Sequence, residues 1–204
     1  LPNIPSDDES DLEGAGDEEV ISAGESEDYI YDQAEAEAAR FYEEAFEMTK
    51  QSILSSYTID NTSLELNALK FACNASFSDC RRAVFSALAS LIDINRTSAS
   101  VTELLEAWSP LLVKFIHSPD DQVELIDHLH DWLIKNPDFS LAFHVILPQL
   151  YKLDVLEDSS IIEWYHEHAQ DAPDGEADLY CRQIKGFVSW LEESEDEDDE
   201  EEEN

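Results

Sequence analysis

The charged residues of this chain are distributed so unevenly that only its middle is suited to fold as a compact domain. Residues 1–39 contain 14 acidic residues and no lysine or arginine, and residues 192–204 contain 11 and again none. Segments with high net charge and few apolar residues cannot offset the entropy that is lost on ordering. We therefore expect a disordered acidic linker over 1–29, a folded domain over 30–193 and a disordered acidic tail over 194–204.

The folded segment shows the periodicity of α-helices throughout and no alternating strand pattern. Apolar residues recur at three- and four-residue spacing, as with Leu66 and Leu69, and about eight such segments follow one another with short connections. The last segment is predicted to run from near Asp174 to about Glu193. Consecutive helices with one apolar face each typically stack in antiparallel pairs, so the predicted fold is an all-α, HEAT-type α-solenoid.

Several residues predict where individual helices begin or bend. Four serines precede apolar-periodic segments and are expected to be N-caps: Ser78, Ser100, Ser118 and Ser160. After Ser100 and Ser160, a glutamate three residues later completes the pattern of a capping box. Pro110 and Pro148 lie inside helical segments and predict a kink or a division there.

The sequence contains no pattern typical of bond-making chemistry or of a bound cofactor. It has five glycines and neither of the glycine-rich loops that cradle nucleotide phosphates. His128 and His130 are two residues apart, as are His166 and His168, which places the rings of each pair on different faces of a helix. We therefore expect no metal site and no cofactor, and we interpret His144 as a core histidine.

The net charge of −38 narrows the classes of partner. It disfavours nucleic acids and anionic membranes, because their phosphates would be repelled. No apolar run approaches the roughly 18 residues that a membrane span needs. Cys73, Cys80 and Cys181 lack metal-binding spacing and indicate reduced thiols in a cytoplasmic protein. Because the chain begins with Leu1 rather than methionine, we expect it to be part of a longer protein.

Two tryptophans near the C-terminus lie among carboxylates and indicate a surface for a basic, lysine-rich partner. Trp190 falls at the edge of the inward-facing stripe of its helix, where a half-exposed indole suits a lysine through cation–π and ionic contacts. For both tryptophans, packing in the core is the alternative. The expected partner-binding residues around Trp190 and on the preceding helix are Glu163, Trp164, Glu167, Glu192, Glu193 and Glu195.

Two further residues are candidates for function. Ser194 is followed by an acid at the third position, a context that suits phosphorylation by an acidophilic kinase. Glu65 lies off the apolar face that Leu66 and Leu69 form. From the residues alone, Glu65 is interpreted as part of a solvated helix face.

Three segments resemble a known family. Residues 146–167 and 186–203 resemble the two aromatic and acidic boxes that close W2-type domains, which occur in translation initiation factors five and 2B-epsilon and in the four-G scaffold family. Residues 63–88 begin with SLELNALKF and are similar to the start of this domain in the epsilon subunit of initiation factor 2B.

The resemblance implies the catalytic segment of a guanine nucleotide exchange factor that acts on initiation factor 2 without bond-making chemistry. The catalytic glutamate of the family matches Glu65, and its critical second-box tryptophan matches Trp190. The implied partners are the gamma subunit, which is the GTPase, and the lysine-rich blocks of the beta subunit. Other subunits of the 2B complex would bind through a missing N-terminal part of the chain.

Two alternatives remain open at this point. A W2 module that only recruits a lysine-rich translation factor would have the boxes but no exchange activity. An unrelated acidic chaperone for basic proteins such as histones would need only the tail.

Overall fold

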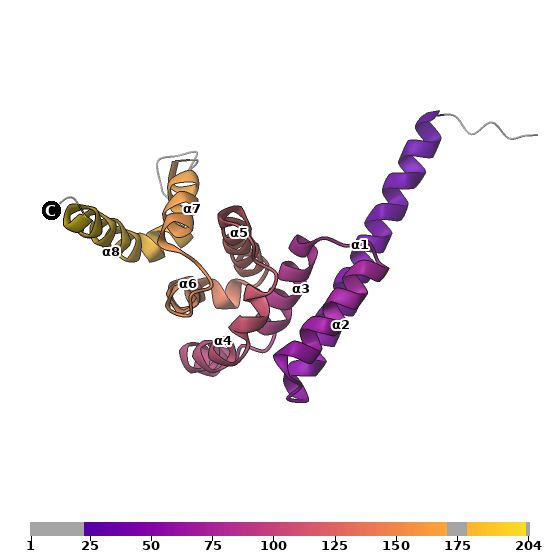
Figure 1. Ribbon diagram of the computed structural model, residues 1–204, viewed down its shortest axis with the longest axis horizontal. Coiled ribbons are helices and arrows are strands. Elements are labelled where there is room, and N and C mark those ends of the chain that lie inside the picture. Colours follow the sequence, from indigo (N-terminus) through magenta and orange to yellow (C-terminus); the bar gives the residue numbers. More distant parts are fainter. Residues whose placement is uncertain (1–22, 171–178, 203–204) are drawn as a thin grey trace, which may run out of the picture. The chain divides into compact units, whose positions relative to one another are not determined.

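A computed structural model of the chain describes the backbone of residues 23–170 and 179–202, and the side chains of residues 35–169 and 179–194. These residues form α-helices and two 3₁₀ helices, without a strand among them (Figure 1). The elements are α1 (Ala23–Leu54), α2 (Ile59–Ala72), α3 (Phe77–Ala89), η1 (Ile94–Arg96), α4 (Thr97–Val113), α5 (Pro119–Lys135), η2 (Pro137–Ala142), α6 (Phe143–Lys152), α7 (Asp158–Gln170) and α8 (Leu179–Glu202).

The chain divides into two compact units, Leu1–Glu35 and Ala36–Asn204. Of the first unit, the structure describes only the backbone at the beginning of α1 and the side chain of Glu35. The second unit contains the rest of α1 and all other elements. None of the described helices is both long and apolar enough to cross a membrane.

The helices of the second unit stack in two layers. In one layer α3 contacts α5 and α5 contacts α7, and in the other α2, α4, α6 and α8 contact one another in that order. The layers are joined because α3 packs on α4, α5 on α6 and α7 on α8. This alternation is the arrangement of HEAT-type helix pairs. The predicted all-α, HEAT-type fold is therefore confirmed.

Each helix buries the apolar face that its sequence predicts. Leu66 of α2 is fully buried, and Leu69 packs partly against the same core. The inward stripe of α8 consists of Tyr180, Ile184, Val188 and Leu191, all of them buried. The start expected for this helix at Asp174 lies outside the described residues, and α8 begins at Leu179 in the part that follows.

Of the four serines that were predicted to be N-caps, one lies at the start of a helix. Ser118 caps α5: its Oγ accepts a hydrogen bond from the Asp121 amide at 3.3 Å, and Pro119 is the first helical residue. The caps expected at Ser78, Ser100 and Ser160 are wrong, because these serines lie inside α3, α4 and α7.

A residue further upstream starts the helix in each of those three cases. Ser76 caps α3 in a reciprocal capping box with Asp79, which satisfies the first backbone amides before Ser78 is reached. α4 follows directly from η1, and the buried Ser100 instead accepts a hydrogen bond from the Asp93 amide at 2.9 Å. α7 begins at Asp158, and Ser160 is fully buried within it.

The prolines do not interrupt their helices. α4 continues through Pro110 and α6 through Pro148, so neither helix is divided there, and the kinks expected at these residues stay predictions. The apolar segment around Pro148 begins as the 3₁₀ helix η2 before α6 takes over. The backbone of residues 23–29 and 194–202, which we expected to be disordered, lies within α1 and α8, and glutamate and alanine are residues that favour helices. Residues 1–22 lie outside the described residues.

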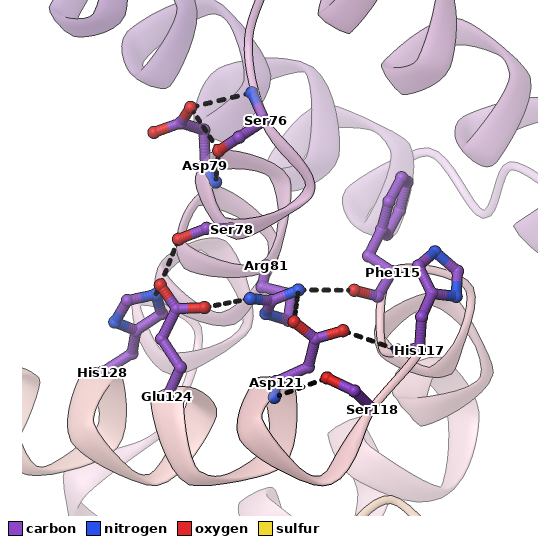
Figure 2. A network of polar contacts seen from close by, with 10 residues as sticks. All are labelled: Ser76, Ser78, Asp79, Arg81, Phe115, His117, Ser118, Asp121, Glu124 and His128. Atoms are coloured by element: carbon purple, nitrogen blue, oxygen red, sulfur yellow. Dashed lines mark hydrogen bonds and ion pairs between the residues drawn. The ribbon is translucent and has the colours of Figure 1, made fainter.

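A buried arginine ties α3 to α5 and to the end of α4 (Figure 2). Arg81 is 2% exposed, and its Nη1 lies 2.9 Å from Asp121 Oδ1 and donates to the Phe115 carbonyl at 2.9 Å. Its Nη2 pairs with Glu124, which also accepts a hydrogen bond from Ser78. Removing one partner of such a group leaves a buried charge unpaired, so this network is expected to hold the helices in register.

The network sets the charge state of Glu124. Burial alone works to raise the pKa of this carboxyl group, but the hydrogen bonds from Ser78 and Arg81 and the positive charge of Arg81 outweigh it and hold the pKa below its usual range. Glu124 therefore remains a carboxylate at neutral pH. Burial also lowers the pKa of His128, which lies one turn further along α5.

Candidate functional site

Trp164, the first of the two candidate tryptophans, belongs to the core. Its side chain is fully buried, and its Nε1 donates to Asp127 Oδ1 on α5 at 2.7 Å. The imidazole of His168 stacks on the indole at 4.1 Å between ring centroids, and His130 meets it edge-on at 5.5 Å. The prediction that Trp164 contacts a partner is therefore wrong, because other side chains already surround its ring.

Trp190 has the opposite environment. Its side chain is 53% exposed on α8, in agreement with its predicted place at the edge of the inward stripe. Phe187 stacks on the indole at 6.0 Å and 18° between ring planes, and Tyr151 from α6 meets it nearly perpendicularly at 6.3 Å. We call Tyr151, Phe187, Trp190 and Glu193 the Trp190 edge.

The predicted acidic residues lie on two neighbouring helices. Glu163 and Glu167 are exposed on α7, and Glu193 is exposed on α8. Glu192 lies 2.9 Å from Nε2 of His166, a contact that joins α8 to α7. The side chain of Glu195 lies outside the described residues.

Ser194 lies one helical turn after Trp190. Its hydroxyl donates to the Leu191 carbonyl at 2.8 Å and approaches the Trp190 carbonyl at 3.2 Å. A phosphate at this position would add about 1.5 to 2 negative charges beside the exposed indole. The phosphorylation of Ser194 stays a prediction.

Glu65 lies on the outer face of α2, in the layer that ends with α8. Thr58 caps the helix through its side chain, and Leu66 anchors the opposite face in the core. The exposed residues of the helix recur at three- and four-residue spacing, so they share one face. We call this surface the Glu65 face; it consists of Asp60, Asn61, Leu64, Glu65, Ala68, Phe71 and Ala72.

The Glu65 face combines two large exposed apolar side chains with two carboxylates, Asp60, which pairs with Lys114 at 3.1 Å, and Glu65. Leu64 is 69% exposed and Phe71 is 77% exposed, which is unusual for the outer surface of a terminal helix in a stack. Within the part of the chain that the structure describes, no hydrogen bond or ion pair engages Glu65. The interpretation of Glu65 as a solvent-facing residue is confirmed, and its apolar neighbours favour a contact surface.

Histidines meet across helices in a way that spacing along one helix does not reveal. His130 of α5 and His168 of α7 lie 5.6 Å apart between ring centroids. Among the described residues, no group of three or more potential ligands is arranged to hold a metal ion. His144 is exposed, so its interpretation as a core histidine is wrong.

The cysteines and a cleft on the second unit lie apart from the predicted site residues. None of the three cysteines forms a disulfide, and burial raises the pKa of Cys80 to about 12, which leaves its thiol protonated at neutral pH. A cleft of about 770 Å³ lies between α1, α3 and α5, with Tyr42, Arg82 and Trp132 among its lining residues. None of the predicted site residues lines this cleft.

Comparison with known proteins identifies the fold and its relatives. Residues 121–201 match the family model described as W2, eIF4-gamma/eIF5/eIF2-epsilon. The translation initiation factor eIF2B subunit epsilon of Dictyostelium discoideum is 35% identical over 173 residues, which cover 80% of this chain and 24% of that protein. The same subunit of Schizosaccharomyces pombe is 31% identical over 185 residues, or 87% of this chain and 25% of that protein.

A second group of relatives shares less of the chain. The eIF5-mimic protein 2-A of Danio rerio is 32% identical over 125 residues, which cover 59% of this chain and 29% of that protein. The chain spans about a quarter of the length of the epsilon subunits that it matches. Residues 121–201 therefore belong to the W2 family, in a chain that is similar over most of its length to the epsilon subunits of translation initiation factor eIF2B.

Proposed function

We propose that this chain is the exchange-promoting segment of an eIF2B epsilon subunit, which binds initiation factor 2 and accelerates the release of its GDP. The observation that carries the proposal is Glu65, a carboxylate without a partner among the described residues, on the exposed surface of α2 that also carries Leu64 and Phe71. A surface of this composition suits insertion against another protein, because its apolar side chains gain by leaving water.

An exchange factor acts by binding the nucleotide-free GTPase more tightly than the nucleotide-bound form. By thermodynamic linkage, the same factor then weakens the binding of the nucleotide. In our proposal Leu64 and Phe71 anchor α2 on the gamma subunit, and Glu65 approaches the nucleotide site. A carboxylate there opposes the phosphates electrostatically and competes for Mg²⁺, which prefers oxygen ligands.

The Trp190 edge serves a different step in this proposal. A half-exposed indole beside Glu193, on a chain with a net charge of −38, suits the lysine-rich blocks of the beta subunit. Electrostatic attraction of this kind mainly raises the rate of association. The edge would thus concentrate initiation factor 2 near the domain, while the Glu65 face acts on the nucleotide.

The alternative is a W2 module that binds without promoting exchange, as the similarity to eIF5-mimic proteins would allow. The longer matches to the epsilon subunits, over 173 and 185 residues against 125, favour the exchange function. An acidic chaperone that needs only the tail is disfavoured by the family match, which extends over four helices.

The test is the release of fluorescent GDP from purified initiation factor 2, with and without the 204-residue chain. We expect the chain to accelerate release at concentrations where it also binds a lysine-rich peptide. Binding of the peptide without any acceleration would favour the adaptor function instead.

A further inference from the structure

Lys70 is a buried lysine in the last turn of α2, and it directly precedes Phe71 of the Glu65 face. Its side chain is 7% exposed, whereas every other lysine of the chain is at least partly exposed. Among the described residues, no hydrogen bond or ion pair engages its ammonium group. Burying a strongly hydrated ammonium group costs free energy, so other contacts must offset that cost.

Two aromatic rings supply these contacts. The Nζ atom of Lys70 lies 4.2 Å from the ring centroid of Phe71 and 4.3 Å from that of Phe77, distances at which cation–π attraction acts. Neighbouring residues of a helix do not normally face each other, so the contact with Phe71 requires the lysine to bend toward that ring. Phe77 belongs to α3 and packs on Phe115 and His117. The ammonium group thus links the ring of Phe71 to a ring that other parts of the fold hold in place.

The charge of the helix end explains why a cation lies there but not why it is buried. A lysine in the last turn interacts favourably with the carbonyl groups at the C-terminus of a helix. An exposed lysine would provide the same interaction and keep its hydration. The burial of Lys70 therefore indicates that its contacts with the two rings matter.

Phe71 is the ring that benefits, because it is 77% exposed. Exposed side chains change rotamer freely, and a partner that binds such a side chain must immobilise it at a cost in entropy. A ring that is already held in its binding orientation avoids most of this cost. Phe77, which packs on its own neighbours, needs no such support.

We infer that Lys70 is a positioning residue, which holds the exposed ring of Phe71 in the orientation that contacts the GTPase. The inference rests on the proposed function, because it assigns Lys70 to the contact between the Glu65 face and the gamma subunit. Lys70 acts through Phe71 and makes no contact with the nucleotide. A contact that is present throughout the exchange reaction changes the affinity of the two proteins and not the maximal rate.

The test measures the affinity of the 204-residue chain for nucleotide-free initiation factor 2, together with GDP release at saturating chain. Lys70→Met removes the charge and keeps an unbranched side chain that packs well on aromatic rings. We expect binding to weaken about threefold to fivefold and the maximal rate of release to stay within about twofold of the wild type. Lys70→Arg keeps a cation that stacks on rings, so its affinity should lie within about twofold of the wild type.

A double-mutant cycle tests whether Lys70 acts through Phe71. Phe71→Ala should weaken binding about tenfold, and adding Lys70→Met should then change the affinity by less than about 1.5-fold.

Lys50→Met is the matched control, because Lys50 Nζ lies over the Phe46 ring at 5.5 Å on α1. This variant removes the same charge and the same kind of contact away from α2, and we expect its affinity to stay within about 1.5-fold of the wild type.

Three results would overturn the positioning role: wild-type affinity in Lys70→Met, an equal loss in Lys50→Met, or a full further loss from Lys70→Met in the Phe71→Ala background. If Lys70→Met lowers the Tm strongly, Phe77→Leu takes its place, since it keeps the charge and removes the second ring. It should weaken binding about twofold, and only while Phe71 is present.

Failure of the proposed function is seen separately, as full GDP release in Glu65→Ala. A loss of affinity in Lys70→Met that depends on Phe71 would then still support the positioning role at this contact surface.

Discussion

The Glu65 face and the Trp190 edge terminate the same helix layer and differ in composition. The Glu65 face exposes two aliphatic or aromatic side chains, Leu64 at 69% and Phe71 at 77%, together with the carboxylates of Asp60 and Glu65. The Trp190 edge consists of three aromatic rings, among them one 53% exposed indole, and Glu193, and the sequence that follows it is strongly acidic. Within this layer α2 contacts α4, α4 contacts α6 and α6 contacts α8. Two helices therefore lie between the two surfaces.

This difference teaches that the domain is suited to two contacts of different kinds. Exposed apolar side chains gain their binding energy at short range, where fit decides the outcome. An acidic surface with a ring attracts basic partners over about 8 Å at physiological ionic strength. A variant at one surface should therefore leave the other intact, provided that the helices between them stay folded.

The largest expected change in the free energy of unfolding distinguishes Trp164 from Trp190. Trp164→Ala removes a fully buried ring and its hydrogen bond to Asp127, so it should lower the free energy of unfolding by about 3–5 kcal/mol. Trp190→Ala removes a half-exposed ring and should cost about 1 kcal/mol or less. Denaturant unfolding measures both, and equal losses would contradict the assignment of one ring to the core and the other to the edge.

The next largest expected loss of stability tests whether the Arg81 network holds the helix stack between the two surfaces together. Arg81→Leu leaves Asp121 and Glu124 without their cation, and we expect a loss of about 3 kcal/mol in stability. Arg96→Leu is the matched control, because its ion pair with Glu103 is exposed and should contribute less than about 1 kcal/mol. Similar unfolding midpoints for the two variants would show that the Arg81 network does not hold the stack together.

The sequence predicted the helices and their buried faces better than it predicted the Arg81 network or the residues at which the helices start. Periodicity identifies the inward face of α8 and the position of Trp190, because each depends on residues of one helix. The burial of Trp164 depends on Asp127 and His130, which reach it from α5 across more than thirty residues. No local sequence pattern distinguishes Arg81 from an exposed arginine, because its partners come from α5 and from the end of α4.

The candidate site residues also divide into features that one helix predicts and features that depend on contacts between helices. The solvent-facing position of Glu65 follows from the phase of Leu66 and Leu69 within α2. The matching of Glu65 and Trp190 to functional residues came from resemblance to a family, since no local pattern distinguishes them. The support that Tyr151 gives to Trp190 comes from another helix, and only the three-dimensional structure shows it.

A smaller effect concerns the Trp190 edge alone. Phosphorylation of Ser194 adds negative charge one turn from the indole, so affinity for a lysine-rich peptide should rise about threefold to fivefold. Phosphorylated and unmodified protein are compared by fluorescence anisotropy at low and high salt. We expect the gain to disappear at high salt and nucleotide exchange at saturating partner to be unchanged. Weaker peptide binding after phosphorylation would contradict the proposed role of the Trp190 edge.

The smallest expected effect is on the pH dependence of stability, and it comes from His128 in α5. Because burial lowers the pKa of His128 in the folded state, the unfolded chain takes up this proton first as the pH falls below about 6.5. The stabilisation that His128 provides is therefore present above this pH and is lost as the pH falls toward its folded pKa. Chemical unfolding of His128→Gln between pH 7.5 and pH 5 should depend less on pH than that of the wild type. An equal dependence would mean that another group is responsible.

The most direct test of the account compares exchange and binding in Glu65→Ala and Trp190→Ala. GDP release from initiation factor 2 is measured over a range of concentrations, with a lysine-peptide titration and circular dichroism on the same samples. We expect Glu65→Ala to remain folded and to bind the peptide normally, but to slow release about 100-fold, which corresponds to roughly 3 kcal/mol. Trp190→Ala should weaken peptide binding and regain its exchange rate at high partner concentration. Full exchange activity in a folded Glu65→Ala protein would contradict the catalytic role of the Glu65 face and leave a binding-only W2 domain.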